Sequence, residues 1–120
     1  MREFDSDVFN DSIKLSKRIR KLVKNDMDKN DQFTIGTQII RASISISSNI
    51  AEGFGRNSDS QILNFLNIAN GSCCEVISQL YVINDDDCLD TEKIKLLMSE
   101  AFGIKEQLRR LIHHYNSKKQ

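Results

Sequence analysis

Apolar residues recur at steps of three and four along most of the chain, which is the spacing of one face of an α-helix. The last of these stripes repeats from Ile94 to Tyr115 without interruption. The periodic segments cover approximately residues 7–28, 33–54, 58–84 and 90–117. Only short polar segments separate them, so neighbouring helices should run antiparallel. The pattern predicts an all-α fold, an antiparallel up-down-up-down four-helix bundle, with residues 1–120 forming a single domain.

The second segment is the least typical helix of the four, because it is rich in Ser and β-branched residues, which are mediocre helix formers. Residues 43–47 alternate as in a strand, but the helical stripe from Ile35 to Gly53 extends over nearly twenty residues. We therefore predict a helix that depends on tertiary packing. Ile40 and Ile44 add a second apolar line, which predicts contacts with neighbours on two sides.

Composition narrows the classes of protein that remain. The chain has no Pro, which favours long helices. Basic and acidic residues number 17 each, so the net charge of zero favours no class of partner. No apolar run is long enough to span a membrane and no signal-peptide stretch opens the chain, which predicts a cytoplasmic protein. Cys73, Cys74 and Cys88 fit neither a disulfide framework nor a zinc site, so we expect reduced thiols.

Candidate catalytic groups are few. His113 and His114 are adjacent near the end of the last helix, so they point in different directions. Glu52 and Glu75 could meet between the second and third helices as in di-iron bundles, but the Glu-x-x-His pairs of such sites are missing. Residues 53–56 are too short for a phosphate-binding loop. We expect a protein that is not an enzyme, with no catalytic residue, no cofactor and no metal site.

A polar stripe with steps of three and four crosses the second helix, and a similar line crosses the third. One interpretation is structural: Glu52 pairs with Arg56 or Arg41, and Asn49 ties down a helix end. The other is that the stripe serves assembly through close helix approach and hydrogen bonding. The residues predicted to act in the motif or in assembly are Arg41, Ser45, Asn49, Glu52, Gly53, Arg56, Gly71 and Glu75.

The stretch from Thr37 to Arg56, with its core Arg-Ala…Ser-Ile…Ser-Asn-Ile-Ala-Glu-Gly…Arg, resembles the signature of a bacterial four-helix-bundle family. The family is named for reading frames in intervening sequences of the 23S ribosomal RNA gene. A second block from Phe65 to Leu80 is also similar, and the resemblance covers nearly the whole chain. It implies a four-helix protomer and, by analogy with characterised relatives, a homopentameric ring with a central channel.

Relatives in this family include accessory proteins of diversity-generating retroelements, which act with a reverse transcriptase and nucleic acid. Most members have no established activity, and a shared fold does not assign one. This chain departs from the family pattern in two ways. Ser47 stands where the family often has Pro, and a pI of about 6.7 contrasts with the strongly basic nucleic-acid-binding relatives, which weakens the transfer of that function.

Basic residues nevertheless cluster on the first helix and near the end of the last. Such clusters can contact phosphates despite a net charge of zero. The predicted candidates for nucleic-acid binding are Lys14, Lys17, Arg18, Lys21, Lys24, Arg109 and Arg110, with Arg20 beside them. Two hypotheses stay open. The chain is an oligomeric binding protein that engages RNA or DNA, with or without a protein partner, or it is purely a protein–protein scaffold, which the neutral charge favours.

Overall fold

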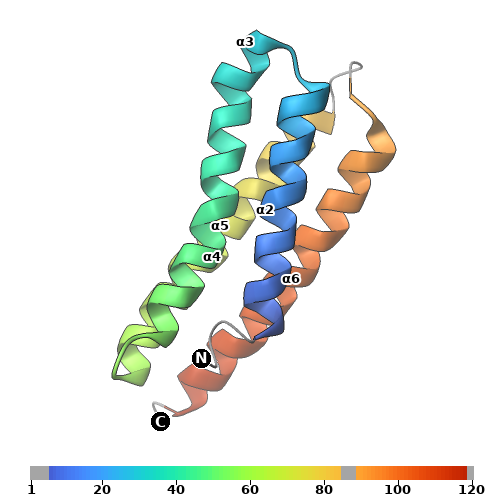
Figure 1. The fold of residues 1–120 in the computed structure, drawn as a ribbon. Coiled ribbons are helices and arrows are strands. Elements are labelled where there is room, and N and C mark those ends of the chain that lie inside the picture. Colours follow the sequence, from blue (N-terminus) through green and yellow to red (C-terminus); the bar gives the residue numbers. More distant parts are fainter. Residues whose placement is uncertain (1–5, 85–88, 119–120) are drawn as a thin grey trace.

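The computed structural model describes residues 6–84 and 89–118 (Figure 1). Its four long helices are α2 (Asp7–Asp26), α4 (Thr37–Phe54), α5 (Asp59–Asn84) and α6 (Thr91–Lys118). Two short elements, α3 (Lys29–Asp31) and the π-helical η1 (Gln32–Gly36), connect α2 to α4. Helix α2 packs against α4 and α6, and α5 packs against the same two helices, so the four surround one core. The predicted all-α four-helix bundle is confirmed.

The connection between α2 and α4 differs from the predicted boundaries. Helix α2 ends at Asp26, two residues before the expected position, because the backbone of Met27 is extended. The Asp28 carboxylate then accepts a hydrogen bond from the Asp31 backbone N–H at 2.8 Å and begins α3. The following helix was expected to begin at residue 33, but this stretch is π-helical and regular α-helix begins at Thr37.

The predicted stripes form the core. Leu15, Ile19, Ile46 and Leu108 are fully buried, and each comes from the inner stripe expected for its helix. The second apolar line of α4 is divided: Ile40 is partly buried and packs against the core, whereas Ile44 is 44% exposed. The predicted contacts of α4 with two neighbours are present, with α2 and with α5.

Each pair of neighbouring helices is also joined by a polar contact. The contacts, in order around the bundle, are Ser16–Ser43 (3.2 Å), Ser45–Ser72 (2.8 Å), the Cys73 thiol to the Ala101 carbonyl (3.3 Å), and the Gln107 amide to the Asp11 carboxylate (2.9 Å). Polar groups buried between helices are costly unless they find partners. Such contacts therefore favour one register of the helices over others.

Two glycines let backbones approach closely. A Cβ at Gly36 would lie 2.7 Å from Val23 Cγ1, so η1 packs directly onto α2. A Cβ at Gly53 would lie 3.0 Å from the Cβ of Phe65, where α4 crosses α5. The first approach is the one that brings the start of α4 beside the basic helix.

Candidate nucleic-acid interface

The outer surface of α2 is basic over most of its length. Its apolar residues recur at helical spacing and are buried, which leaves the remaining faces to solvent. Residues 12–25 include six cations and no carboxylate. Those six residues are Lys14, Lys17, Arg18, Arg20, Lys21 and Lys24. All six are exposed, so α2 presents an uninterrupted stripe of positive charge.

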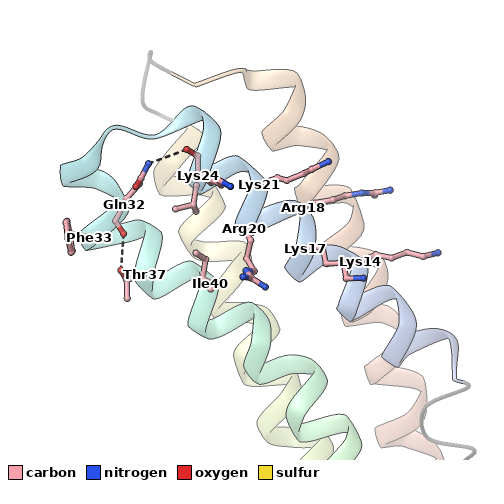
Figure 2. Close-up of a pocket in the computed structure, with 11 residues that line it drawn as sticks. Lys14, Lys17, Arg18, Arg20, Lys21, Lys24, Gln32, Phe33, Thr37 and Ile40 are labelled. Atoms are coloured by element: carbon pink, nitrogen blue, oxygen red, sulfur yellow. Dashed lines mark hydrogen bonds between the residues drawn. The ribbon is translucent and has the colours of Figure 1, made fainter.

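A groove of about 850 Å³ runs along this stripe, bounded by α2, η1 and the first turns of α4 (Figure 2). All six cations line it, and their side chains extend outward from α2. Val23 and Ile40 contribute apolar surface, while Gln32, Phe33 and Thr37 line the side formed by η1 and α4. No carboxylate is among the lining residues, so the groove is a positively charged concavity with an apolar component.

Ion pairing leaves most of this charge uncompensated. Arg18 pairs with Glu100 of α6, but within residues 6–84 and 89–118 the other five cations of the stripe make no ion pair. Two of the three acidic groups of α2 are engaged elsewhere: Asp11 accepts from Gln107, and Asp26 pairs with Lys93 at 3.2 Å. The positive potential of the groove is therefore not cancelled by its own helix.

The corner at η1 is held in place by hydrogen bonds. The Gln32 side-chain amide donates to the Met27 carbonyl at 2.9 Å and to the Lys24 carbonyl at 3.4 Å. The Thr37 hydroxyl in turn donates to the Gln32 carbonyl at 2.9 Å. Phe33, the next residue in η1, is 82% exposed, and its ring projects away from the bundle (Figure 2).

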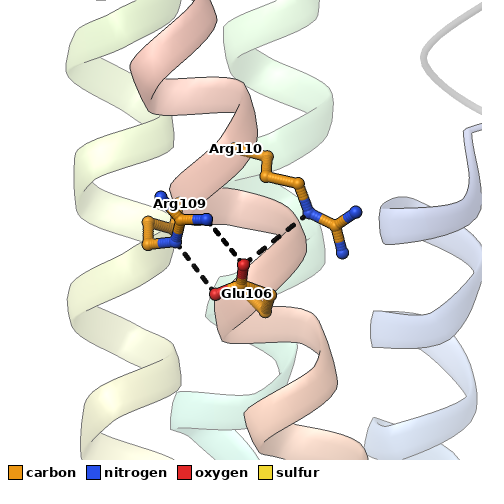
Figure 3. A network of polar contacts seen from close by, with 3 residues as sticks. All are labelled: Glu106, Arg109 and Arg110. Atoms are coloured by element: carbon orange, nitrogen blue, oxygen red, sulfur yellow. Dashed lines mark hydrogen bonds and ion pairs between the residues drawn. The ribbon is translucent and has the colours of Figure 1, made fainter.

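The basic residues of α6 are arranged differently from those of α2. Arg109 and Arg110 both approach Glu106, with nitrogen–oxygen distances of 2.7 and 3.9 Å (Figure 3). The hydrogen bond from Arg109 lowers the pKa of the Glu106 carboxyl, and Glu106 raises the pKa of Arg109. Part of this positive charge is thus neutralised locally. Both arginines stay candidates for phosphate contact, but neither lines the groove.

The polar stripe predicted on α4 divides into two parts in the structure. Ser45 contacts Ser72 of α5 and so lies between the two helices, and the Asn49 amide donates to the Ser45 carbonyl at 2.8 Å within α4. Glu52 is exposed and pairs with Arg56.

The guanidinium of Arg56 also lies 4.7 Å from the ring centroid of Phe65, and Arg41 is exposed. The Glu52–Arg56 pair is one that the structural interpretation expected, whereas Asn49 bonds to Ser45 inside α4 and does not tie down a helix end.

The α5 members of the predicted set lie on the outer face of that helix. A Cβ at Gly71 would meet nothing within 4 Å, and Glu75 accepts a 3.4 Å hydrogen bond from Gln79. Neither residue joins the α4 stripe in a common site. Gly53 is buried against α5 at the close approach described above.

The remaining chemically reactive residues do not form a cluster. Burial raises the pKa of the Cys73 thiol to about 12, with the neighbouring Cys74 adding to the effect. Cys88 lies outside the described residues. His113 and His114 are both exposed. In the part of the chain that the structure describes, no group of three or more His, Cys, Asp or Glu side chains could hold a metal ion, and no helix is long and apolar enough to cross a membrane.

Sequence reasoning identified the cations of the groove but missed its opposite wall. Phe33 was assigned to the first turn of an ordinary helix, where an aromatic residue usually packs inward. The extra residue of the π-helical turn changes the direction of that side chain, and hydrophobic periodicity does not show where such a turn occurs. The one available signal was an aromatic residue directly after the polar run at residues 25–32.

Comparisons with known proteins place the chain among bacterial relatives. A family model described as 23S rRNA-intervening sequence protein matches residues 4–110. A solved structure from Bacteroides thetaiotaomicron, a protein of unknown function from the S23 ribosomal protein family, is 26% identical and superposes with a TM-score of 0.81. The match covers 88% of this chain and 97% of that one. No curated protein matches the sequence significantly.

Proposed function

We propose that this chain, which belongs to the 23S rRNA-intervening sequence protein family, is a non-enzymatic, self-associating protein that binds the phosphate backbone of RNA or DNA through α2. One observation carries the proposal: six cations line a single groove that contains no carboxylate, and five of them make no ion pair with described residues. Solvated helix faces usually mix both signs of charge, as α6 does here. A concave surface of one sign is what a polyanion requires.

The spacing of the cations supports a backbone contact. Residues three or four apart on a helix are separated by about 5 Å along its axis, so the stripe from Lys14 to Lys24 extends over about 15 Å. Cations at that spacing can meet several phosphates of one strand at once. Each contact releases condensed counterions, and binding therefore weakens steeply as salt is added.

Self-association is the second part of the proposal. The outer surface of α4 and α5, here called the charge-poor face, carries Ile68, Tyr81 and Val82 at 45%, 56% and 56% exposure. From Ser60 to Asn84 the only charged residue is Glu75. Depletion of charge together with exposed apolar and aromatic groups is typical of the core of a protein interface. A second copy of the chain is the proposed occupant, and the family resemblance suggests a pentamer.

The alternative function is a protein–protein scaffold that binds no nucleic acid. The charge-poor face would serve that function equally well, and only the groove on α2 separates the two. The free cysteines accord with either function in a cytoplasmic protein, where thiols stay reduced.

The deciding experiment reverses charge inside and outside the groove. Lys17→Glu with Lys21→Glu should weaken binding to labelled structured RNA and duplex DNA by at least about tenfold, because two attractions become repulsions. Lys95→Glu with Lys118→Glu makes the same change in net charge on exposed positions of α6, and we expect it to have a much smaller effect. Circular dichroism and melting temperature verify that both variants fold.

Two results would contradict the proposal. Equal losses in both variants would mean that net charge alone sets the affinity and that the groove is not the site. No binding by the unaltered protein at low salt would favour the protein scaffold.

A further inference from the structure

We infer that the α2 groove selects unpaired nucleotides, because Phe33 provides an exposed aromatic ring on which one base can stack while the cations hold the adjoining phosphates. The inference rests on the proposed function and goes beyond it, since phosphate contacts alone do not distinguish a single strand from a duplex. It names the class of nucleic acid that this site would take.

The exposure of Phe33 is the first observation. At 82% it is the most exposed of the large hydrophobic side chains in the described residues, and the ring does not pack onto the core. An aromatic ring in water forgoes roughly 2 kcal/mol that burial would provide. The ring lines the same groove as the apolar side chains of Val23 and Ile40. An apolar surface beside a row of cations is the combination that single-strand-binding proteins use.

The fixed position of the ring is the second observation. Hydrogen bonds from Gln32 to the carbonyls that end α2, and from Thr37 to Gln32, hold the residues on either side of Phe33. The close approach of Gly36 to Val23 packs the same turn against α2. A stacking platform gains affinity when its backbone is ordered before the base arrives. The π-helical turn supplies that order at the point where the ring leaves the bundle.

The charges around the corner set the path of the strand. Lys24 and Arg20 are the cations of the stripe that lie toward η1 in Figure 2. Asp28 and Asp31 are at the same corner of the chain, but neither lines the groove. They would repel phosphates that continued past Phe33. A strand therefore runs along α2, with one base turned onto the ring. The paired and stacked bases of a duplex could not make that contact without flipping out.

The test compares an unstructured single-stranded RNA with a blunt-ended duplex RNA of equal phosphate number, by fluorescence anisotropy at one salt concentration. Phe33→Ala should weaken single-strand binding by about 5- to 140-fold and leave duplex binding within about twofold, since stacking contributes roughly 1–3 kcal/mol per base. Phe33→Tyr keeps an aromatic face and should bind as the unaltered chain does. Phe102→Ala removes another exposed phenylalanine, 45% exposed on α6, and should change neither affinity.

The outcomes separate this inference from the proposal beneath it. If Phe33→Ala leaves the single-strand affinity unchanged while Lys17→Glu with Lys21→Glu lowers it, the groove binds phosphates and the stacking role is wrong. If Phe33→Ala instead changes the oligomeric state measured by sedimentation, the ring belongs to a contact between copies, and the inference also fails. If the unaltered chain binds neither RNA, both the inference and the proposed function fall.

Discussion

The two halves of the bundle bury similar apolar stripes but present very different outer surfaces. Helices α2 and α6 carry nine Asp, Glu, Lys or Arg residues each, whereas α4 and α5 carry two each. Charge is not needed to form a helix, so this contrast reflects what each surface meets. A solvated face gains from charge, and an interface loses from burying it. The difference supports the proposals that α2 meets a charged ligand and that α4 and α5 meet another copy of the chain.

The charged half is itself divided. On α6 and around it, cations meet carboxylates: Arg109 and Arg110 share Glu106, and Lys93 pairs with Asp26. On α2, cations follow one another without a carboxylate between them. Exposed ion pairs contribute little to stability, so the pairing on α6 is ordinary for a solvated helix. The unmixed charge on α2 carries a cost in self-repulsion, and a polyanionic partner would offset it.

Placing charge on α5 should change the oligomeric state more than any other substitution considered for this chain. Ile68→Glu with Val82→Glu places two charges on the charge-poor face, and burying them between copies would cost several kcal/mol. We expect the oligomer to dissociate, with a mass by light scattering that falls to that of one chain. Leu96→Glu is the matched control, because Leu96 is 59% exposed on α6 and lies outside that face.

An unchanged mass for Ile68→Glu with Val82→Glu would show that copies do not meet through α5. A monomeric mass for the Leu96→Glu control alone would place the contact on the charged half instead. Either result would contradict the proposal that copies of the chain associate through the charge-poor face.

Two glycine substitutions, one on α4 and one on α6, should change the stability of the fold in opposite directions. Gly53→Ala adds a methyl group 3.0 Å from Phe65 Cβ and 3.3 Å from the Ile62 carbonyl, and backbone cannot easily give way. We expect the free energy of unfolding to fall by about 1–2 kcal/mol, because overpacking outweighs the gain in helix propensity. Gly103→Ala on α6 meets nothing within 4 Å and should raise it by about 0.5–1 kcal/mol. Urea denaturation measures both, and equal changes would contradict the close approach of α4 and α5.

Hydrophobic periodicity was sufficient to predict the four helices and nearly all of the core, because burial follows the helical repeat directly. It placed Ile44 in contact with a neighbour, although this side chain is exposed. Apolar residues on the outer side of a helix give the same local signal as buried ones. The sequence also listed the six cations of α2 but could not show which were paired, because Glu100 lies more than 80 residues from Arg18 along the chain.

The position of Phe33 on the wall of the groove could not be predicted either, and the reason is different. Whether Phe33 points inward or outward depends on one extra residue in a π-helical turn, and that turn is stabilised by tertiary contacts such as Gly36 against Val23. The polar stripe on α4 illustrates the same limit. Ser45 and Glu52 share a helical face in the sequence pattern, yet one contacts α5 and the other is exposed. The spacing of residues in the sequence shows which of them share a helical face. Which part of that face is buried depends on how the neighbouring helices pack.

If the cations of α2 that make no ion pair with described residues bind phosphates, the affinity for nucleic acid must depend steeply on salt concentration. The measurement is the affinity of the unaltered protein for a labelled single-stranded RNA across a series of salt concentrations. If about five cations contact phosphates, a plot of the logarithm of the association constant against the logarithm of the salt concentration should have a slope of about −3 to −4. A slope near zero, or no binding at the lowest salt concentration, would contradict the claim and leave α2 as a solvated helix.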